Sequence, residues 1–153
     1  MPTTLIAGPM FSGKSTELLR YLERAVRGNK KVCLIRPMID DREFFSHSNG
    51  TQTVFDSLPI TTYVFSDTYE NNYKSFTQIL KEYDVIGIDE CQFIPALVYY
   101  LIDLIKHNKT TYLSGLLASS ENEVFKPIKE ILPYCDIIEK LNGVCSKCGS
   151  ELG

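Results

Sequence analysis

A glycine-rich loop near the amino terminus constrains the fold more than any other part of this chain. Residues 8–15 read GPMFSGKS, which matches the pattern G-x-x-x-x-G-K-[ST]. A short apolar run ends at Gly8, and a segment with leucines at helical spacing begins after Lys14. A strand, such a loop and a helix in this order bind phosphates through backbone N–H groups. The sequence therefore predicts binding of a nucleoside triphosphate, with a plain glycine turn as the alternative.

The loop residues have distinct expected roles toward the phosphates. Lys14 is expected to reach the β- and γ-phosphates, and the Ser15 hydroxyl is expected to bind Mg²⁺. The positive end of the following helix adds to the same attraction. The loop residues predicted to contact the nucleotide are Gly8, Pro9, Met10, Phe11, Ser12, Gly13, Lys14 and Ser15.

Short apolar runs alternate with amphipathic segments along the rest of the chain. Strands are expected at residues 5–7, 31–36, 61–65, 84–88, 110–114 and 135–140. Helices are expected at residues 15–27, 73–83, 95–107 and 125–132. This alternation predicts an α/β fold of three layers with a mainly parallel sheet of about six strands. With the glycine-rich loop, it is interpreted as a P-loop (RecA-like) fold. Residues 1–141 are interpreted as this nucleotide-binding domain, and residues 142–153 as a separate glycine-rich tail.

Composition argues against two classes of partner. The net charge is −3 and no basic stripe is present, so nucleic-acid binding is not expected. No apolar run approaches the ~20 residues of a membrane-spanning helix, and the start of the chain lacks the layout of a signal peptide. Of the five cysteines only Cys145 and Cys148 are spaced as a pair, which favours reduced thiols and a cytoplasmic location.

Two acidic residues follow the strand expected at residues 84–88. An aspartate at the carboxyl end of a strand beside the P-loop strand can hold Mg²⁺, which is the role expected of Asp89. The next residue, Glu90, is expected to point elsewhere and to act as a base toward a substrate hydroxyl. A solvated acidic turn is the alternative, but the complete P-loop favours a site for phosphoryl transfer.

Five segments form a pattern that extends over nearly the whole chain, from Thr4 to Cys148. They read GPMFSGKSTEL, Asp40-x-Arg42, a serine- and histidine-containing loop at 46–50, VIGIDECQF and Val-Cys-x-x-Cys. Together they resemble the type II thymidine kinases, a family of cellular cytosolic, bacterial and large-DNA-virus enzymes. The resemblance implies a kinase domain that transfers the γ-phosphate of ATP to the 5′-hydroxyl of thymidine. It also implies Mg²⁺ with ATP, a structural Zn²⁺ and homotetramers.

The resemblance assigns roles to individual residues near the phosphates. Glu90 matches the catalytic base of the family. The environment of the phosphates and Mg²⁺ is matched by Ser15, Asp40, Arg42 and Asp89. ATP contacts are implied for Asp89 and for Gln92 in the same loop. His47 is interpreted as a loop histidine rather than a catalyst.

The resemblance also implies a nucleoside site, in which this chain departs from the family. Phe93 matches an aromatic residue that packs on the base, with plain core packing as the alternative. Further nucleoside contacts are expected from Leu116, Ser120 and Phe125. Where the family reads Gly-Leu-Asp-x-x-Phe, this chain has Leu117 at the acidic position and Ser120 at the phenylalanine position. Loss of an aromatic contact costs roughly 1 kcal/mol or more, so we expect weak or altered nucleoside selectivity.

The carboxyl-terminal segment is interpreted as half of a zinc site. Cys145 and Cys148 have the spacing of a zinc knuckle, but a structural zinc needs four ligands and the chain offers no second pair. A redox pair and a chance spacing are the alternatives. Residues 142–153 are thus expected to be an incomplete zinc-ribbon and lasso segment, without the loop that covers the nucleoside in the family.

Two functions therefore remain open at the level of the sequence. The chain is expected to bind ATP yet to phosphorylate thymidine poorly, because a missing covering loop would leave the site open to water. The alternative is a P-loop module that binds ATP without catalysis. Truncation, a disrupted reading frame and degeneration of the sequence would each produce this pattern.

Overall fold

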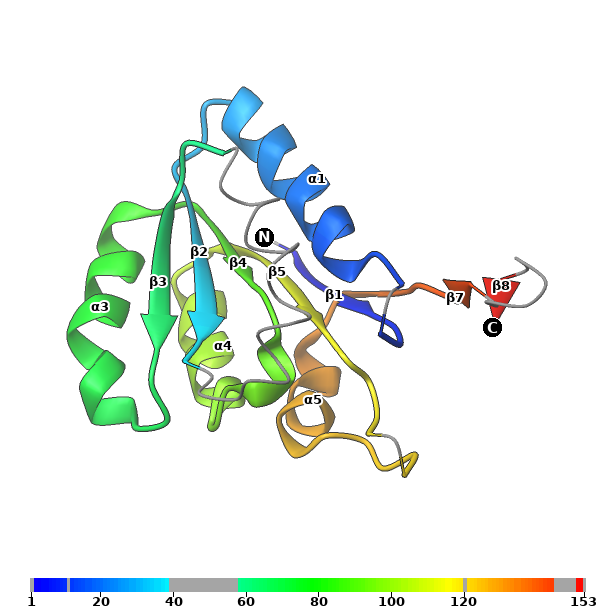
Figure 1. Ribbon diagram of the computed structural model, residues 1–153. Coiled ribbons are helices and arrows are strands. Elements are labelled where there is room, and N and C mark those ends of the chain that lie inside the picture. The colour runs from blue at the N-terminus through cyan, green and yellow to red at the C-terminus, as the bar shows by residue number, and fades with distance from the viewer. Residues whose placement is uncertain (1, 11, 39–57, 120, 145–150, 153) are drawn as a thin grey trace.

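Six parallel strands form a single sheet in the computed structural model, which describes residues 2–10, 12–38, 58–119, 121–144 and 151–152 (Figure 1). The order of the strands is β3-β2-β4-β5-β1-β6. Their bounds are β1 (Thr3–Ala7), β2 (Val32–Pro37), β3 (Thr61–Phe65), β4 (Val85–Ile88), β5 (Thr110–Gly115) and β6 (Ile137–Lys140). The predicted α/β fold with a parallel sheet of six strands is confirmed.

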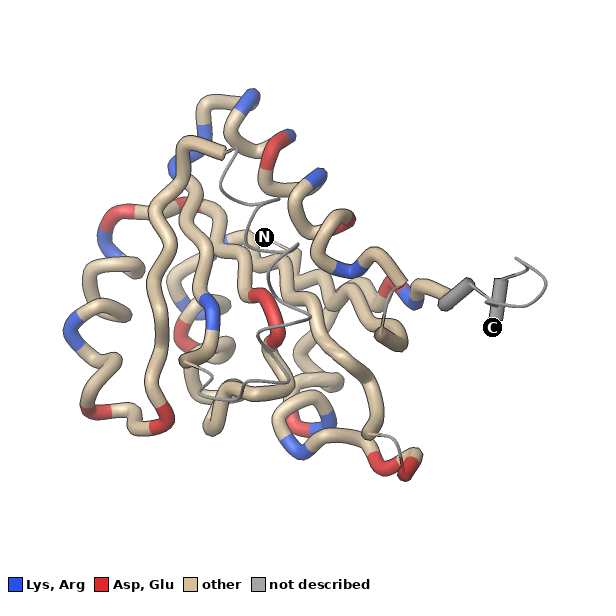
Figure 2. Tube along the Cα trace, in the orientation of Figure 1, with Lys and Arg blue, Asp and Glu red and all other residues tan. Residues whose placement is uncertain are grey.

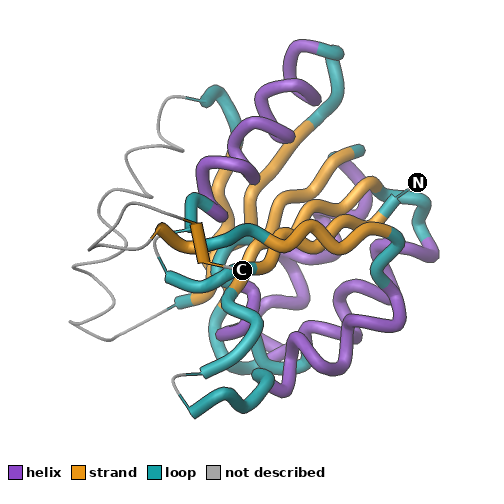
Figure 3. The backbone as a smooth tube through the Cα atoms, turned by 90° about the vertical axis from the view of Figure 1, so that its right-hand side faces the viewer, coloured by secondary structure: helices purple, strands orange, loops and turns teal. Residues whose placement is uncertain are grey.

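Helices cover both faces of this sheet. The helices are α1 (Lys14–Arg27), α3 (Tyr69–Glu82), α4 (Leu97–Lys106) and α5 (Lys126–Ile131), with 3₁₀ turns η1 (Cys91–Phe93) and η2 (Leu132–Tyr134). Figure 3 shows α1 on one side of the sheet and the other helices on the opposite side. The three predicted layers are therefore present.

Alternation along the strands divides the core between the two faces. Ile6 on β1 packs in one cluster with Leu18 and Leu22 of α1. Its neighbour Leu5 belongs to the other cluster, which α3, α4 and α5 cover. Successive side chains of a strand point to opposite faces, so a strand buried on both faces reads as a continuous apolar run. This is why short apolar runs in the sequence predicted the strands.

Two helices begin two or more residues from their expected starts, while α1 and α5 begin within one residue of theirs. Helix α3 starts at Tyr69 rather than at residue 73, because the buried Asn72 fixes its first turn. The Asn72 side chain bonds both backbone groups of Ser66 and the hydroxyl of Tyr100, a set of tertiary contacts that local periodicity does not reveal. Helix α4 starts at Leu97 rather than at residue 95, because Ala96 adopts a left-handed conformation with φ of 59°.

The end of the chain differs from the expectation in a similar way. Strand β6 begins at Ile137 rather than at residue 135, because η2 occupies the preceding residues and the N–H of Cys135 donates to Leu132. Beyond β6, the short strands β7 (Gly143–Val144) and β8 (Glu151–Leu152) form an antiparallel pair. Cys145 and Cys148 lie outside the described residues, so the zinc-ribbon element stays a prediction.

The cysteines and the helix lengths bear on the expected reduced thiols and on the search for a membrane-spanning helix. Cys33 and Cys91 are buried free thiols and Cys135 is a half-buried one, in agreement with the reduced thiols that the cysteine spacing favours. Within the described ranges, no helix is long and apolar enough to cross a membrane.

Gly87 on β4 leaves the space that α1 needs to approach the sheet. A Cβ atom at this position would lie 2.8 Å from Cδ1 of Leu22 on α1. We expect Gly87→Ala to lower the free energy of unfolding by about 1–3 kcal/mol, since overpacking forces side chains out of their rotamers. Urea denaturation measures this. Gly28→Ala is the control, because a Cβ there meets no atom closer than 3.5 Å; an equal loss in both variants would contradict the packing argument.

Candidate active site

The P-loop connects β1 to α1 at the carboxyl edge of the sheet, in the context that the sequence predicted. Gly13 has φ of +84°, a left-handed conformation that glycine adopts without strain. A Cβ on Gly8 would lie 2.7 Å from Oγ of Ser12 and 2.8 Å from the carbonyl oxygen of Leu141. Gly13 is therefore favoured by its backbone conformation, and Gly8 by the close approach of Ser12 and Leu141.

The described part of the loop presents polar groups suited to an anion. Gly13 precedes α1 and has no side chain that could cap the first N–H groups of the helix. The first N–H groups of a helix lack partners inside the helix and attract phosphate. The Ser12 hydroxyl oxygen is buried and makes no hydrogen bond within the described chain. A phosphate would supply the missing partner, so these residues fit the predicted nucleotide.

Lys14 is held within the same loop. Its side chain is buried, and Nζ donates a hydrogen bond of 2.7 Å to the carbonyl oxygen of Pro9. Burial lowers the pKa of Lys14, and the nearby carboxyl groups of Glu90 and Asp89 oppose that shift. The ammonium group is therefore part of one electrostatic unit with both predicted acids.

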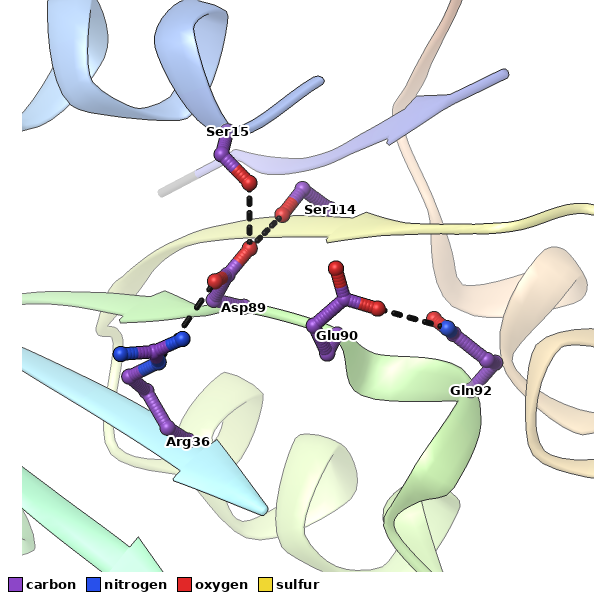
Figure 4. A network of polar contacts seen from close by, with 6 residues as sticks. All are labelled: Ser15, Arg36, Asp89, Glu90, Gln92 and Ser114. Carbon is purple, nitrogen blue, oxygen red and sulfur yellow. Dashed lines mark hydrogen bonds and ion pairs between the residues drawn. The ribbon is translucent and has the colours of Figure 1, made fainter. Parts of the chain in front are cut away.

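Asp89 is the centre of a buried polar network at the end of β4 (Figure 4). Its Oδ1 accepts hydrogen bonds from Ser15 Oγ at 3.1 Å and from Ser114 Oγ at 2.8 Å. Its Oδ2 lies 3.6 Å from Nε of Arg36 and accepts no hydrogen bond within the described chain. Burial raises the pKa of Asp89, and the Ser114 bond and the Arg36 charge oppose the rise.

This network fits a magnesium ion. Mg²⁺ prefers oxygen ligands and is usually held by one or two carboxylates, water and substrate phosphates. The carboxylate of Asp89 and the hydroxyl of Ser15 are such ligands, and they already lie in contact. Oδ2 of Asp89 is a buried oxygen with an ion pair to Arg36 but no hydrogen bond within the described chain, so it can still accept a cation. The residue pair predicted to hold Mg²⁺ is thus assembled in one place.

Glu90 leaves the line of the strand. Its φ of 51° and ψ of 45° are left-handed, a conformation that costs a non-glycine residue of order 1–3 kcal/mol. Its Oε2 accepts a hydrogen bond of 2.8 Å from Nε2 of Gln92. Burial and the neighbouring Asp89 raise the pKa of Glu90, while Gln92, Lys14 and Arg36 oppose that rise. The backbone turn therefore separates the Glu90 carboxylate from that of Asp89, as the sequence predicted.

Phe93 and Phe125 meet beside the acidic pair. Their ring centroids are 6.2 Å apart in an edge-to-face arrangement, and Phe93 remains 39% exposed. Leu117, at the position that is acidic in the family pattern, packs against the apolar core instead. Both aromatic residues predicted to contact the nucleoside thus lie together, with part of one ring accessible.

Two residues of this site were missed by the sequence reasoning, namely Arg36 and Ser114. Ile88 of β4 is in register with Ile35 of β2 and with Leu113 of β5. The next residue of each strand therefore lies beside Asp89, and these residues are Arg36 and Ser114. The sheet order brings them together, and a single sequence does not give that order.

Several predicted site residues lie outside the described ranges. They are Phe11, Asp40, Arg42, Ser120, Cys145 and Cys148, and the loop histidine His47 lies outside these ranges as well. Their assigned roles stay predictions. Among the described residues, the structure brings together Ser15, Lys14, Asp89, Glu90 and Gln92 at one edge of the sheet. Figure 2 shows that the acidic end of β4 lies between basic residues.

A separate cavity lies at the other end of the strands. It has a volume of about 470 Å³ and is lined by residues at the starts of β2 and β3, among them Lys31, Val32, Ile60 and Thr61. Ligands of parallel sheets bind beyond the carboxyl ends of the strands. The candidate active site is therefore the P-loop edge and not this cavity.

The fold and the site define a P-loop protein with two acids beside its phosphate loop. A family model described as thymidine kinase matches residues 1–152. The chain belongs to the thymidine kinase family.

Relatives from several lineages agree with that assignment. A thymidine kinase of Ureaplasma urealyticum is 34% identical over 154 residues, which cover 96% of this chain and 65% of the relative. A thymidine kinase of Amsacta moorei entomopoxvirus is 34% identical over 150 residues, covering 97% of this chain and 80% of the relative. A thymidine kinase of Thermococcus kodakarensis is 35% identical over 147 residues, covering 95% of this chain and 73% of the relative. The chain thus spans about 65% of the length of the Ureaplasma relative.

Proposed function

We propose that this chain transfers the γ-phosphate of ATP to the 5′-hydroxyl of thymidine. The observation that carries the proposal is the Glu90 carboxylate, held apart from Asp89 beside a complete P-loop. A carboxylate in that position can accept a proton from a hydroxyl that attacks the terminal phosphate. Membership of the thymidine kinase family supports thymidine as the nucleoside.

The proposed reaction assigns each described group one task. The P-loop amides and Lys14 bind the phosphates, while Ser15 and Asp89 would hold Mg²⁺. When bound, that ion neutralises charge on the β- and γ-phosphates. The 5′-hydroxyl gives its proton to Glu90 as its oxygen bonds to the γ-phosphorus, and the bond to the β–γ bridging oxygen breaks to release ADP. A raised pKa brings Glu90 closer to the pH at which a base is most effective.

The nucleoside side of the site is proposed from the family pattern. Phe93 and Phe125 are proposed to contact the thymine ring together with Leu116 and Ser120. Asp40 and Arg42 are proposed to act near the phosphates. The substitutions at Leu117 and Ser120 support weak or altered selectivity, which steady-state kinetics with thymidine and deoxycytidine would measure. Tight turnover of thymidine alone would contradict that part of the proposal.

The deciding experiment is ATP turnover by the purified chain with and without thymidine. We expect ADP release that depends on thymidine, because the P-loop, Asp89 and Glu90 are all in place. ATP binding without thymidine-dependent release would instead indicate a non-catalytic ATP-binding module. Family membership does not favour that alternative.

We further propose that Cys145 and Cys148 supply two thiolates to a structural zinc. Strands β7 and β8 pair on either side of the cysteine segment, which supports a hairpin of the kind that zinc ribbons use. Within the residues that the structure describes, no group of three or more histidine, cysteine or acidic side chains could hold a metal. Zinc analysis of the wild type and of Cys145→Ser tests the proposal, and equal zinc contents would contradict it.

Assembly and compartment are proposed in the same way. We propose a homotetramer from the family resemblance and a cytoplasmic location from the cysteine content. Ile137 and Ile138 on the edge strand β6 are 51% and 52% exposed, which is consistent with a surface covered by another copy. Sedimentation equilibrium would distinguish a tetramer from a monomer.

A further inference from the structure

The side chain of Gln92 uses both ends of its amide inside the protein. Its Nε2 donates to Oε2 of Glu90 at 2.8 Å, and its Oε1 accepts from the backbone N–H of Leu116 at 3.1 Å. The residue is only 3% exposed. One side chain therefore joins the predicted base to the loop that follows β5.

The protein leaves space for this side chain. A Cβ atom on Gly115 would lie 2.7 Å from Oε1 of Gln92 and 2.9 Å from Sγ of Cys91. Glycine at the end of β5 is thus what allows the amide to lie against the strand. Both ends of the amide are bonded inside the protein and the side chain is only 3% exposed, so little of Gln92 is accessible to ATP.

The next residue holds the same loop from another side. The ring of Phe93 packs edge-to-face on that of Phe125, which lies where the loop after β5 leads into α5. Gln92 and Phe93 are consecutive in η1, so one short turn contacts both ends of the loop. Any shift of this loop on nucleoside binding would reach Glu90 through one side chain.

We propose that Gln92 is a positioning residue, which fixes the carboxylate of Glu90 and couples its orientation to the loop after β5. The inference rests on the proposed function, since it assumes that Glu90 is the base. Gln92 itself touches neither the phosphate nor the nucleoside in this assignment. Its effect is on the geometry of the base, where a misplacement of 1 Å can cost about 100-fold in rate.

The test compares Gln92→Leu with Asn72→Leu. Asn72 is the matched control because it also carries a side-chain amide and is equally 3% exposed, but it bonds Ser66 just after β3 and Tyr100 on α4. We expect Gln92→Leu to lower kcat with thymidine about 10- to 100-fold, because the base loses its fixed position. The dissociation constant for ATP should stay within about twofold, and the control should keep its kcat within about twofold.

Two outcomes would overturn the proposal. Weaker ATP binding at unchanged kcat would make Gln92 an ATP ligand, as the family pattern suggested. An equal fall of kcat in Asn72→Leu, at the same change of melting temperature, would make the effect a general loss of structure. If Gln92→Leu does not fold, Gly115→Ala displaces the same amide without removing a polar group and should lower kcat in the same direction.

Hydrogen exchange keeps this inference separate from the proposed function. The N–H of Leu116 should exchange slowly in the wild type and in Asn72→Leu, and faster in Gln92→Leu. If the wild type does not phosphorylate thymidine, the proposed function fails, while this exchange still decides whether Gln92 holds the loop. Equal exchange of the Leu116 N–H in all three proteins would refute the coupling.

Discussion

Glu90→Gln is expected to reduce thymidine phosphorylation by about 10²- to 10⁴-fold and to leave ATP binding intact. Glutamine keeps the length of the side chain but cannot accept the proton of the 5′-hydroxyl. The hydrogen bonds of Lys14, Ser15 and Ser114 do not involve the Glu90 side chain, so the nucleotide should bind as before. Coupled measurement of ADP release and of ATP affinity separates the two effects.

The control for this experiment is Glu70→Gln, which makes the same chemical change at an exposed position in the first turn of α3. Turnover by the control should match that of the wild type. Substantial thymidine phosphorylation by Glu90→Gln would place the base elsewhere in the chain. Loss of ATP affinity together with turnover would show that Glu90 serves the nucleotide rather than the acceptor hydroxyl.

Most of the fold could be predicted because it depends on local patterns. The P-loop motif fixes a strand before Gly8 and a helix after Lys14, and the buried strands read as apolar runs. The largest error, at the start of α3, occurs where a tertiary contact sets the boundary. Asn72 determines the start of α3 through a bond to Tyr100, 28 residues away. No pattern within α3 itself contains that information.

The site could be predicted only where function is carried by a contiguous motif. Two such motifs contain Ser15, Asp89 and Glu90, and in the structure the Ser15 hydroxyl donates a hydrogen bond to Asp89. Arg36 and Ser114 come from strands that are neighbours of β4 only in the sheet order. Their residue types are ordinary, so their role follows from register and not from composition.

Asp89→Asn is expected to change activity and stability in opposite directions. Without the carboxylate, Mg²⁺ loses a ligand and turnover should fall by about 10²- to 10³-fold. The protein without nucleotide should become more stable by about 1–2 kcal/mol, a gain typical of relieving a functional site. The reason is that burial disfavours the charged carboxylate of Asp89 more strongly than Arg36, Ser15 and Ser114 favour it.

The stability gained by Asp89→Asn should depend on pH, because the charge of the Asp89 carboxyl depends on pH. A carboxyl group whose pKa is raised by folding binds more protons in the folded state than in the unfolded one. The contribution of Asp89 to the free energy of unfolding is therefore most favourable below its ordinary pKa of 3.8, and it is lost as the pH rises through the raised pKa of the folded state. The gain from Asp89→Asn should grow over that window and then level off. Urea denaturation between about pH 4 and pH 8 without nucleotide measures it.

Asp67→Asn is the matched control, because it makes the same chemical change at an exposed position outside the buried network. Its stability should follow the wild type at every pH. A loss of stability in Asp89→Asn near neutral pH would mean that the contacts to Ser15, Ser114 and Arg36 outweigh the cost of burying the charge. The expected result instead links the destabilisation by the buried charge of Asp89 to function, because a bound cation would stabilise that charge.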